Sequence, residues 1–118
     1  IVGGSVAAVE PELMGYGPMP ATEKLFKKTG LKLSDMGLIE VNEAFAAQYL
    51  AVEKLMGLNR EITNVNGGAI ALGHPGGPTG CRIAITLLYE MMRRGVSLGL
   101  ATLCGGNGPA RSVIIEAL

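Results

Sequence analysis

The sequence has few aromatic residues and no net charge. Only 4% of its 118 residues are aromatic, tryptophan is absent, and ten basic residues balance ten acidic ones. A nucleic-acid-binding surface is rich in positive charge, and single strands also stack their bases on aromatic rings. The balanced charge likewise gives no attraction to an anionic membrane surface. We therefore expect neither nucleic acid nor membrane as a partner.

Cysteine and histidine are scarce as well. The two cysteines, Cys81 and Cys104, are too few for a disulfide scaffold and favour a reducing compartment. The single histidine, His74, and these cysteines have no spacing that would supply three or four metal ligands. No apolar run approaches the roughly 20 residues of a membrane span. We expect no metal ion and no bound cofactor.

Apolar residues, in contrast, are abundant. They make up 48% of the chain, and the mean hydropathy of +0.36 is high for a small domain. The chain starts at Ile1 without a methionine and stops within another apolar run. We expect residues 1–118 to be one domain cut from a longer polypeptide, with apolar surface made to face a missing part. The alternative is an ordinary small domain with a processed terminus.

The spacing of the apolar residues predicts an α/β domain. A loop rich in Gly and Pro is expected over residues 10–20. The expected strands are residues 4–9, 38–42, 62–65, 98–103 and 111–116, and the expected helices are residues 20–30, 43–56 and 79–94. The order β-α-β-α-β-α-β-β predicts a five-stranded, mostly parallel sheet with helices on both faces. The last strand is expected to be antiparallel, because its connection is too short for a parallel crossover.

Three short motifs place polar groups where a predicted strand gives way to a turn or helix. They are Asn42-Glu43-Ala44-Phe45, Gly73-His74-Pro75 and Cys104-Gly105-Gly106. In parallel α/β domains, ligands bind at the carboxyl ends of the strands. We therefore expect the three motifs to converge on one pocket.

Asn42 ends an apolar strand just before a predicted helix. Asn is a favoured helix N-cap, and Glu43 in the first turn would match the helix dipole. The functional alternative is that the amide holds a water in a pocket facing a substrate carbonyl. The residue types alone leave both interpretations open.

His74 lies in a loop made almost entirely of Gly and Pro, which core packing does not require. An imidazole transfers protons near neutral pH and can donate a hydrogen bond to a carbonyl, so we favour a functional role. A Gly-rich loop before a helix can also cradle phosphate, but this one lacks the Lys-Ser/Thr of a P-loop and the spacing of a dinucleotide fingerprint.

Cys104 follows a buried strand and precedes a Gly-rich turn. It could be a small apolar residue at a strand end. It could instead be a reactive thiol beside backbone N–H groups that stabilise an oxyanion. Cys81, within a predicted helix, has the pattern of a structural residue.

Taken together, the motifs closely resemble the C-terminal half of a thiolase. Thiolases make or cleave 3-ketoacyl-CoA by Claisen chemistry. The matching runs cover nearly the whole chain in the family's order, namely residues 16–21, 40–46, 66–75 and 100–106. A ketoacyl synthase is a poorer match, because such enzymes typically use two histidines.

The resemblance implies a role for each catalytic residue. His74 would activate a nucleophilic cysteine and donate to the thioester oxygen, and Asn42 would hold a water in the same oxyanion hole. Cys104 would move the α-proton of the acetyl group as acid and base. The backbone N–H of Gly106 would contribute to a second oxyanion hole. The sequence departs from the usual Gly-Gly run at Asn107.

The resemblance also implies what lies outside this sequence. The nucleophilic cysteine belongs to the N-terminal half, so residues 1–118 alone should be inactive. Acyl-CoA and CoA would be substrates, and the expected partners are that half and further copies of the same chain. The compartment would be the cytosol or, in a eukaryote, the mitochondrion or peroxisome. A non-catalytic domain that binds acyl-CoA or another subunit is the alternative.

Overall fold

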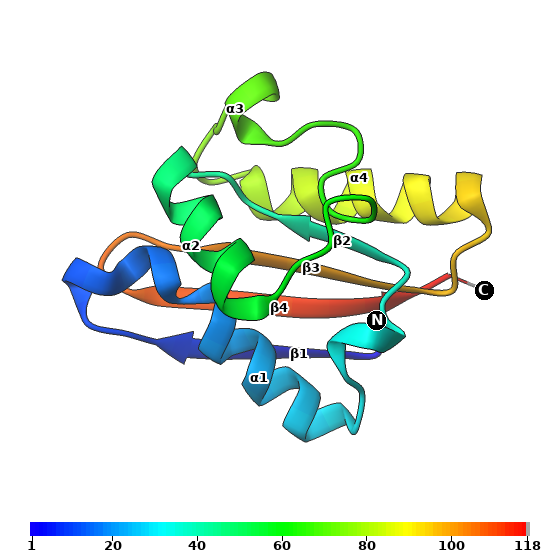
Figure 1. Ribbon diagram of the computed structural model, residues 1–118, viewed down its shortest axis with the longest axis horizontal. Helices are drawn as coiled ribbons and strands as arrows, with labels where there is room; N and C mark the ends of the chain where they lie inside the picture. The colour runs from blue at the N-terminus through cyan, green and yellow to red at the C-terminus, as the bar shows by residue number, and fades with distance from the viewer. Residues whose placement is uncertain (118) are drawn as a thin grey trace.

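The computed structural model describes residues 1–117 and shows a sheet with helices packed against it (Figure 1). The strands are β1 (Gly3–Ala8), β2 (Leu38–Val41), β3 (Leu98–Cys104) and β4 (Pro109–Glu116). The helices are α1 (Pro18–Thr29), α2 (Ala46–Met56), α3 (Ala69–Leu72) and α4 (Thr79–Arg94), with two short 3-10 turns, η1 (Pro11–Tyr16) and η2 (Leu33–Asp35). The expected α/β class is confirmed.

The sheet has four strands in the order β1-β4-β3-β2. β4 pairs antiparallel with both β1 and β3, and β2 pairs parallel with β3. Three strands therefore run in one direction and only the last runs against them, as expected. The expected fifth strand is not confirmed, because the segment 62–65 makes only a single parallel bridge, between Thr63 and Ile39. The next residue, Asn64, has a φ of 48°, which is incompatible with a continuing strand.

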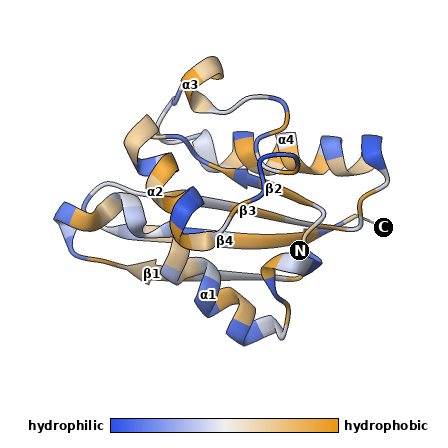
Figure 2. Ribbon diagram, viewed as in Figure 1, coloured by the Kyte–Doolittle hydropathy of each residue, from blue (hydrophilic) through white to orange (hydrophobic). Residues whose placement is uncertain are grey.

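Helices cover both faces of the sheet, as the sequence predicts. Because side chains alternate along a strand, β2 and β3 contribute to two separate cores. Ile39 and Leu100 join α1 and α2 on one face, whereas Leu38 and Ala101 pack under α4 on the other. Figure 2 shows the corresponding alternation of apolar and polar residues along α4.

The helix boundaries differ from expectation at their amino ends. α1 begins at Pro18, two residues early, and η1 occupies part of the expected loop. α2 begins only at Ala46, because Phe45 is extended (φ −145°, ψ 148°). α3 was not expected, whereas α4 spans the predicted residues and ends at Gly95, whose φ is 66°. Within residues 1–117, none of the helices combines the length and apolar character needed to cross a membrane.

Candidate functional site

A cavity of about 470 Å³ lies at the carboxyl end of β3. Its walls come from η1, the loop after β2, the loop before α4, the end of β3 with the turn after it, and β4. The lining residues are Met14, Ala44, Phe45, His74, Gly76, Gly77, Leu103, Cys104, Gly105, Gly106 and Arg111. The structure thus brings parts of all three motifs to one cavity, and His74, Cys104 and Gly106 all line it.

A second cavity of about the same volume, 470 Å³, lies beside α4 on the same side of the sheet, over strands that the helix does not cover. It is lined by β1, β3, β4 and the first turns of α4, and its walls are mainly apolar. Arg111 is the one ionisable residue that lines it, and Arg111 also borders the first cavity. Because proton transfer needs titratable groups, we place the chemical site in the first cavity.

His74 is held from the side by Thr79, the first residue of α4. Its Nδ1 lies 2.8 Å from Thr79 Oγ1, and Thr79 is fully buried. The left-handed φ angles of Gly73 (96°) and Gly76 (72°) allow the tight loop that places the imidazole here. Because Nδ1 is engaged, Nε2 is the nitrogen available for chemistry.

Cys104 is the last residue of β3 and is almost completely buried. Burial raises the pKa of its thiol above the ordinary value, and a backbone hydrogen bond offsets part of that rise. The thiol therefore stays protonated at neutral pH and can act as an acid before it acts as a base.

The turn after Cys104 exposes a backbone donor. Gly105 N–H donates to Pro109 O at 2.6 Å, and Gly108 N–H donates to Gly105 O, so Gly106 N–H lies outside the turn's own bonds. Asn107 sits where thiolases usually have Gly, and its φ of 66° is one that Asn tolerates better than most residues. Asn107 therefore adopts the left-handed conformation that this turn requires.

Asn42 does not line the cavity, but its environment argues for a ligand. It follows β2, its N–H donates to Thr102 O at 2.9 Å, and its side chain is fully buried. Neither amide atom has a hydrogen-bond partner among residues 1–117. Buried polar groups are almost always paired, with water if not with protein. The capping interpretation is wrong, because α2 begins at Ala46 with Phe45 at the N-cap position.

Sequence reasoning missed the residues that hold the motifs in place. Thr79 bonds His74, and Glu43 and Asn64 bond each other across two loops. The only signal was chemical: each is a polar residue next to a motif or within a Gly-rich run. The part of the chain that the structure describes contains no group of three or more His, Cys, Asp or Glu side chains placed to hold a metal ion.

Comparison with known proteins gives a consistent result. The family model described as "Thiolase, C-terminal domain" matches residues 1–117. An acetyl-CoA acetyltransferase of Escherichia coli (strain K12) is 58% identical over 110 residues, which are 93% of this chain and 28% of that protein. A mitochondrial 3-ketoacyl-CoA thiolase of Bos taurus is 54% identical over 116 residues, or 98% of this chain and 29% of that protein.

Solved structures agree with these sequence relatives. The Bacillus anthracis acetyl-CoA acetyltransferase superposes with a TM-score of 0.98 at 54% identity, covering 100% of this chain and 30% of that one. The human mitochondrial 3-ketoacyl-CoA thiolase in complex with CoA gives a TM-score of 0.96 at 51% identity, covering 98% and 29%. The chain thus spans about three tenths of the length of the proteins it matches.

Proposed function

The chain belongs to the thiolase family as its C-terminal domain, and we propose that it supplies the proton-transferring groups of an enzyme that makes or cleaves 3-ketoacyl-CoA. In condensation, an acyl-CoA and acetyl-CoA give a 3-ketoacyl-CoA and free CoA; thiolysis is the reverse. The observation that carries the proposal is the cavity in which His74, Cys104 and Gly106 meet.

The first half-reaction transfers the acyl group to a cysteine of the N-terminal half. His74 Nε2 takes the proton of that cysteine, and the thiolate attacks the acyl-CoA carbonyl. As the carbon–sulfur bond to CoA breaks, the Cys104 thiol gives its proton to the departing CoA thiolate. The step leaves a protonated His74, a Cys104 thiolate and an acylated cysteine.

The second half-reaction forms the carbon–carbon bond. The Cys104 thiolate removes the α-proton of acetyl-CoA, and the carbanion attacks the acyl-cysteine carbonyl. The nucleophilic cysteine leaves and recovers its proton from His74. Every proton is returned, so His74 and Cys104 end the cycle in the protonation states in which they began.

Three residues of this chain stabilise the charge that develops on the thioester oxygens. Protonated His74 and a water held by Asn42 form one oxyanion hole, and Gly106 N–H contributes to the other. The unpaired, buried amide of Asn42 supports the first assignment. The position of Gly106 N–H outside the turn's own bonds supports the second.

We place the N-terminal half on the α4 side of the sheet, against the exposed side of α4 and the strands beside it. The second, mainly apolar cavity opens on it. Ile85, Tyr89 and Met92 of α4 are spaced along one side of the helix and are between 56% and 69% exposed. Burial of this surface would bring the nucleophile to the start of α4, beside His74.

Assembly and location are proposed on the same family grounds. We infer that copies of the full protein associate with one another, as the thiolase resemblance implies. We also place the protein in a reducing compartment: the cytosol or, in a eukaryote, mitochondria or peroxisomes. The bovine and human relatives are both mitochondrial thiolases by name, which supports the mitochondrial location.

The test is a thiolysis assay with acetoacetyl-CoA and CoA. We expect no turnover from the 118-residue chain and turnover from the chain extended upstream through its nucleophile. His74→Ala and Cys104→Ala in the longer protein should each lower kcat by at least roughly 100-fold, in line with the loss of a general acid–base.

The other outcomes are equally informative. If neither protein turns over substrate but the chain binds acyl-CoA, the non-catalytic binding domain is the better function. Turnover by the 118-residue chain alone would show that Cys104 or Cys81 acts as the nucleophile. The division of roles given above would then be wrong.

A further inference from the structure

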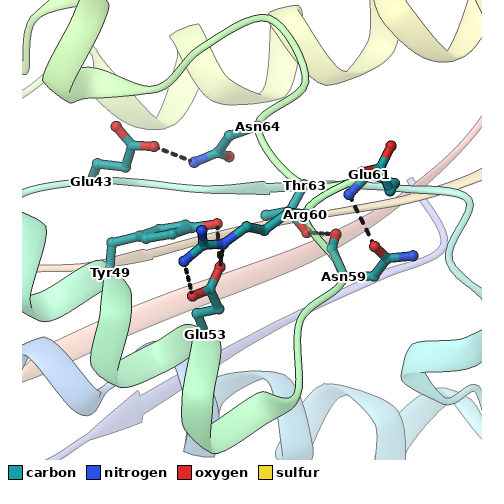
Figure 3. A network of polar contacts seen from close by, with 8 residues as sticks. All are labelled: Glu43, Tyr49, Glu53, Asn59, Arg60, Glu61, Thr63 and Asn64. Atoms are coloured by element: carbon teal, nitrogen blue, oxygen red, sulfur yellow. Dashed lines mark hydrogen bonds and ion pairs between the residues drawn. The ribbon is translucent and has the colours of Figure 1, made fainter.

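The carboxylate of Glu43 connects two segments that carry different motifs. Its Oε1 accepts a hydrogen bond from Asn64 Nδ2 at 2.9 Å, and its Oε2 accepts one from the Ile70 backbone N–H, also at 2.9 Å. Figure 3 shows the Glu43 and Asn64 side chains directed toward each other. Glu43 directly follows Asn42, and Ile70 lies in α3, four residues before His74. Hydrogen bonds of this one carboxylate thus link the segment that carries Asn42 to the segment that carries His74.

Asn64 fixes the other neighbour of Asn42. Val41 N–H donates to Asn64 Oδ1, and Asn64 Nδ2 donates to Val41 O, each at 2.9 Å. The Asn64 side chain therefore pairs with the end of β2 as a neighbouring strand would. These bonds hold Asn64 at its φ of 48°, a conformation that costs energy for a residue other than Gly.

The Glu43 carboxylate packs closely against the backbone at Gly68. A Cβ added at Gly68 would lie 2.2 Å from the carboxylate carbon and from Oε1. A side chain at position 68 would have to push the carboxylate out of its hydrogen bonds with Asn64 and Ile70. The backbone from Gly68 to Ile70 thus packs directly against the carboxylate.

We propose that Glu43 and Asn64 are positioning residues that hold Asn42 and the His74 loop at a fixed separation. This inference rests on the proposed thiolase function. No proton in the reaction described above passes through Glu43, and neither residue lines the cavity. They affect catalysis through Asn42 and His74, because the oxyanion hole needs these two groups at the correct distance from each other.

The experiment uses the full-length protein that carries this domain and the variant Glu43→Gln. An amide accepts a hydrogen bond only at its oxygen, so one of the two bonds is lost while the size of the side chain is kept. We expect kcat for thiolysis to fall roughly 10- to 100-fold, the effect of misplacing a catalytic group by about 1 Å, with KM nearly unchanged. Asn64→Gly, which suits the positive φ, should give a similar loss.

A double-mutant cycle separates positioning from general stability. In an Asn42→Ala background, Glu43→Gln should lower kcat by a smaller factor than in the parent protein, because one of the two groups whose separation it fixes is gone. Glu53→Gln is the matched control. It removes a carboxylate of α2 that bonds Arg60 at 2.6 and 2.8 Å, away from the cavity, and it should leave kcat unchanged (Figure 3).

Amide hydrogen exchange supplies a readout that does not depend on activity. Glu43→Gln should speed amide exchange over residues 68–74 and leave the exchange rates of α4 unchanged. Unchanged exchange in that segment, additive losses with Asn42→Ala, or an equal loss in Glu53→Gln would each overturn the proposal. An inactive parent protein would contradict the proposed function, whereas the exchange result would still decide whether Glu43 and Asn64 hold these segments together.

Discussion

At the scale of single residues, His74 depends on its contact with Thr79. With Nε2 as the base, Nδ1 keeps its proton in both protonation states of the ring and donates it to the buried Thr79 hydroxyl, which accepts in either state. A residue that serves both states keeps the ring oriented throughout a cycle in which Nε2 gains and loses a proton. Thr79 thus has a role that its position in the sequence did not reveal.

Replacing Thr79 by Val should weaken catalysis without disturbing the fold. Val keeps the shape of the side chain and removes only the hydroxyl. We expect kcat of the full-length protein to fall roughly 2- to 10-fold, the factor that corresponds to a net hydrogen bond of about 0.5–1.5 kcal/mol. Thr79→Ser, which restores the hydroxyl, should recover most of the rate in the same steady-state assay. A Val variant with full activity would remove Thr79 from the mechanism.

Glu40 gives the domain a pH-dependent stability. Burial raises its pKa to about 7, although Arg82 partly opposes the shift and Glu43 adds to it. An acid whose pKa is higher in the folded chain stabilises the fold when protonated. This contribution to the free energy of unfolding is complete below about pH 4.5, the pKa of the carboxyl in the unfolded chain. It is lost as the pH rises through about 7, the pKa in the folded chain.

Glu40→Gln should remove this pH dependence, because Gln mimics the protonated acid. Between pH 4.5 and 8 we expect the wild-type chain to lose about 3 kcal/mol of unfolding free energy relative to the variant. Urea titrations across that range measure the difference. Arg93 lowers the pKa of Glu90, which titrates below this window in both proteins and therefore cancels. A constant difference would show that Glu40 has an ordinary pKa.

The site residues could be predicted from sequence because their chemistry is local. A histidine within Gly and Pro, or a cysteine before a Gly-rich turn, is visible in a few consecutive letters. The residues that support them were not predictable in this way. Glu43 and Asn64 are 21 residues apart, and their hydrogen bond exists only after β2 and the loop before α3 have packed together. The unpaired amide of Asn42 is likewise a property of burial.

At the scale of elements, long periodic segments were predictable and short or conflicting ones were not. α4 was expected at its observed bounds because its apolar residues repeat over four turns. α3 is only four residues long and has no periodicity to detect. The start of α2 was placed too early because Asn42-Glu43 is typical of a helix start. In the structure the Glu43 carboxylate bonds Asn64 and Ile70 instead, and the helix begins after it.

The packing of α4 on β3 predicts a large loss on truncation of Leu87. This side chain is 1% exposed and lies over Gly99, which has no side chain to hold the helix away. We expect Leu87→Ala to lower the unfolding free energy by roughly 2–5 kcal/mol. Ile85→Ala, on the exposed side of the same helix, should change it by less than about 0.5 kcal/mol. Equal effects in urea unfolding of the chain would contradict this packing.

At the scale of the whole molecule, the sequence predicted the layers but not the number or order of the strands. The α/β class and the covering of both faces follow from apolar periodicity, which is a property of each element. Strand order depends on which strands pair with each other across the sheet, and no local sequence pattern predicts that pairing. The segment 62–65 has the apolar residues of a strand, but the left-handed turn at Asn64 limits it to one bridge. The antiparallel direction of β4 was predictable from its short connection alone.

The position of β4 between β1 and β3 has a consequence for how the domain forms during synthesis. Within this domain β1 is made before β4, yet among the strands of residues 1–117 β4 is the one that pairs with β1. Until β4 has left the ribosome, the nascent β1 packs against α1 within this domain but has no paired strand there, so its backbone N–H and C=O groups are open to wrong partners. Chaperone protection of the growing chain should therefore matter most while the segment between β1 and β4 is being translated.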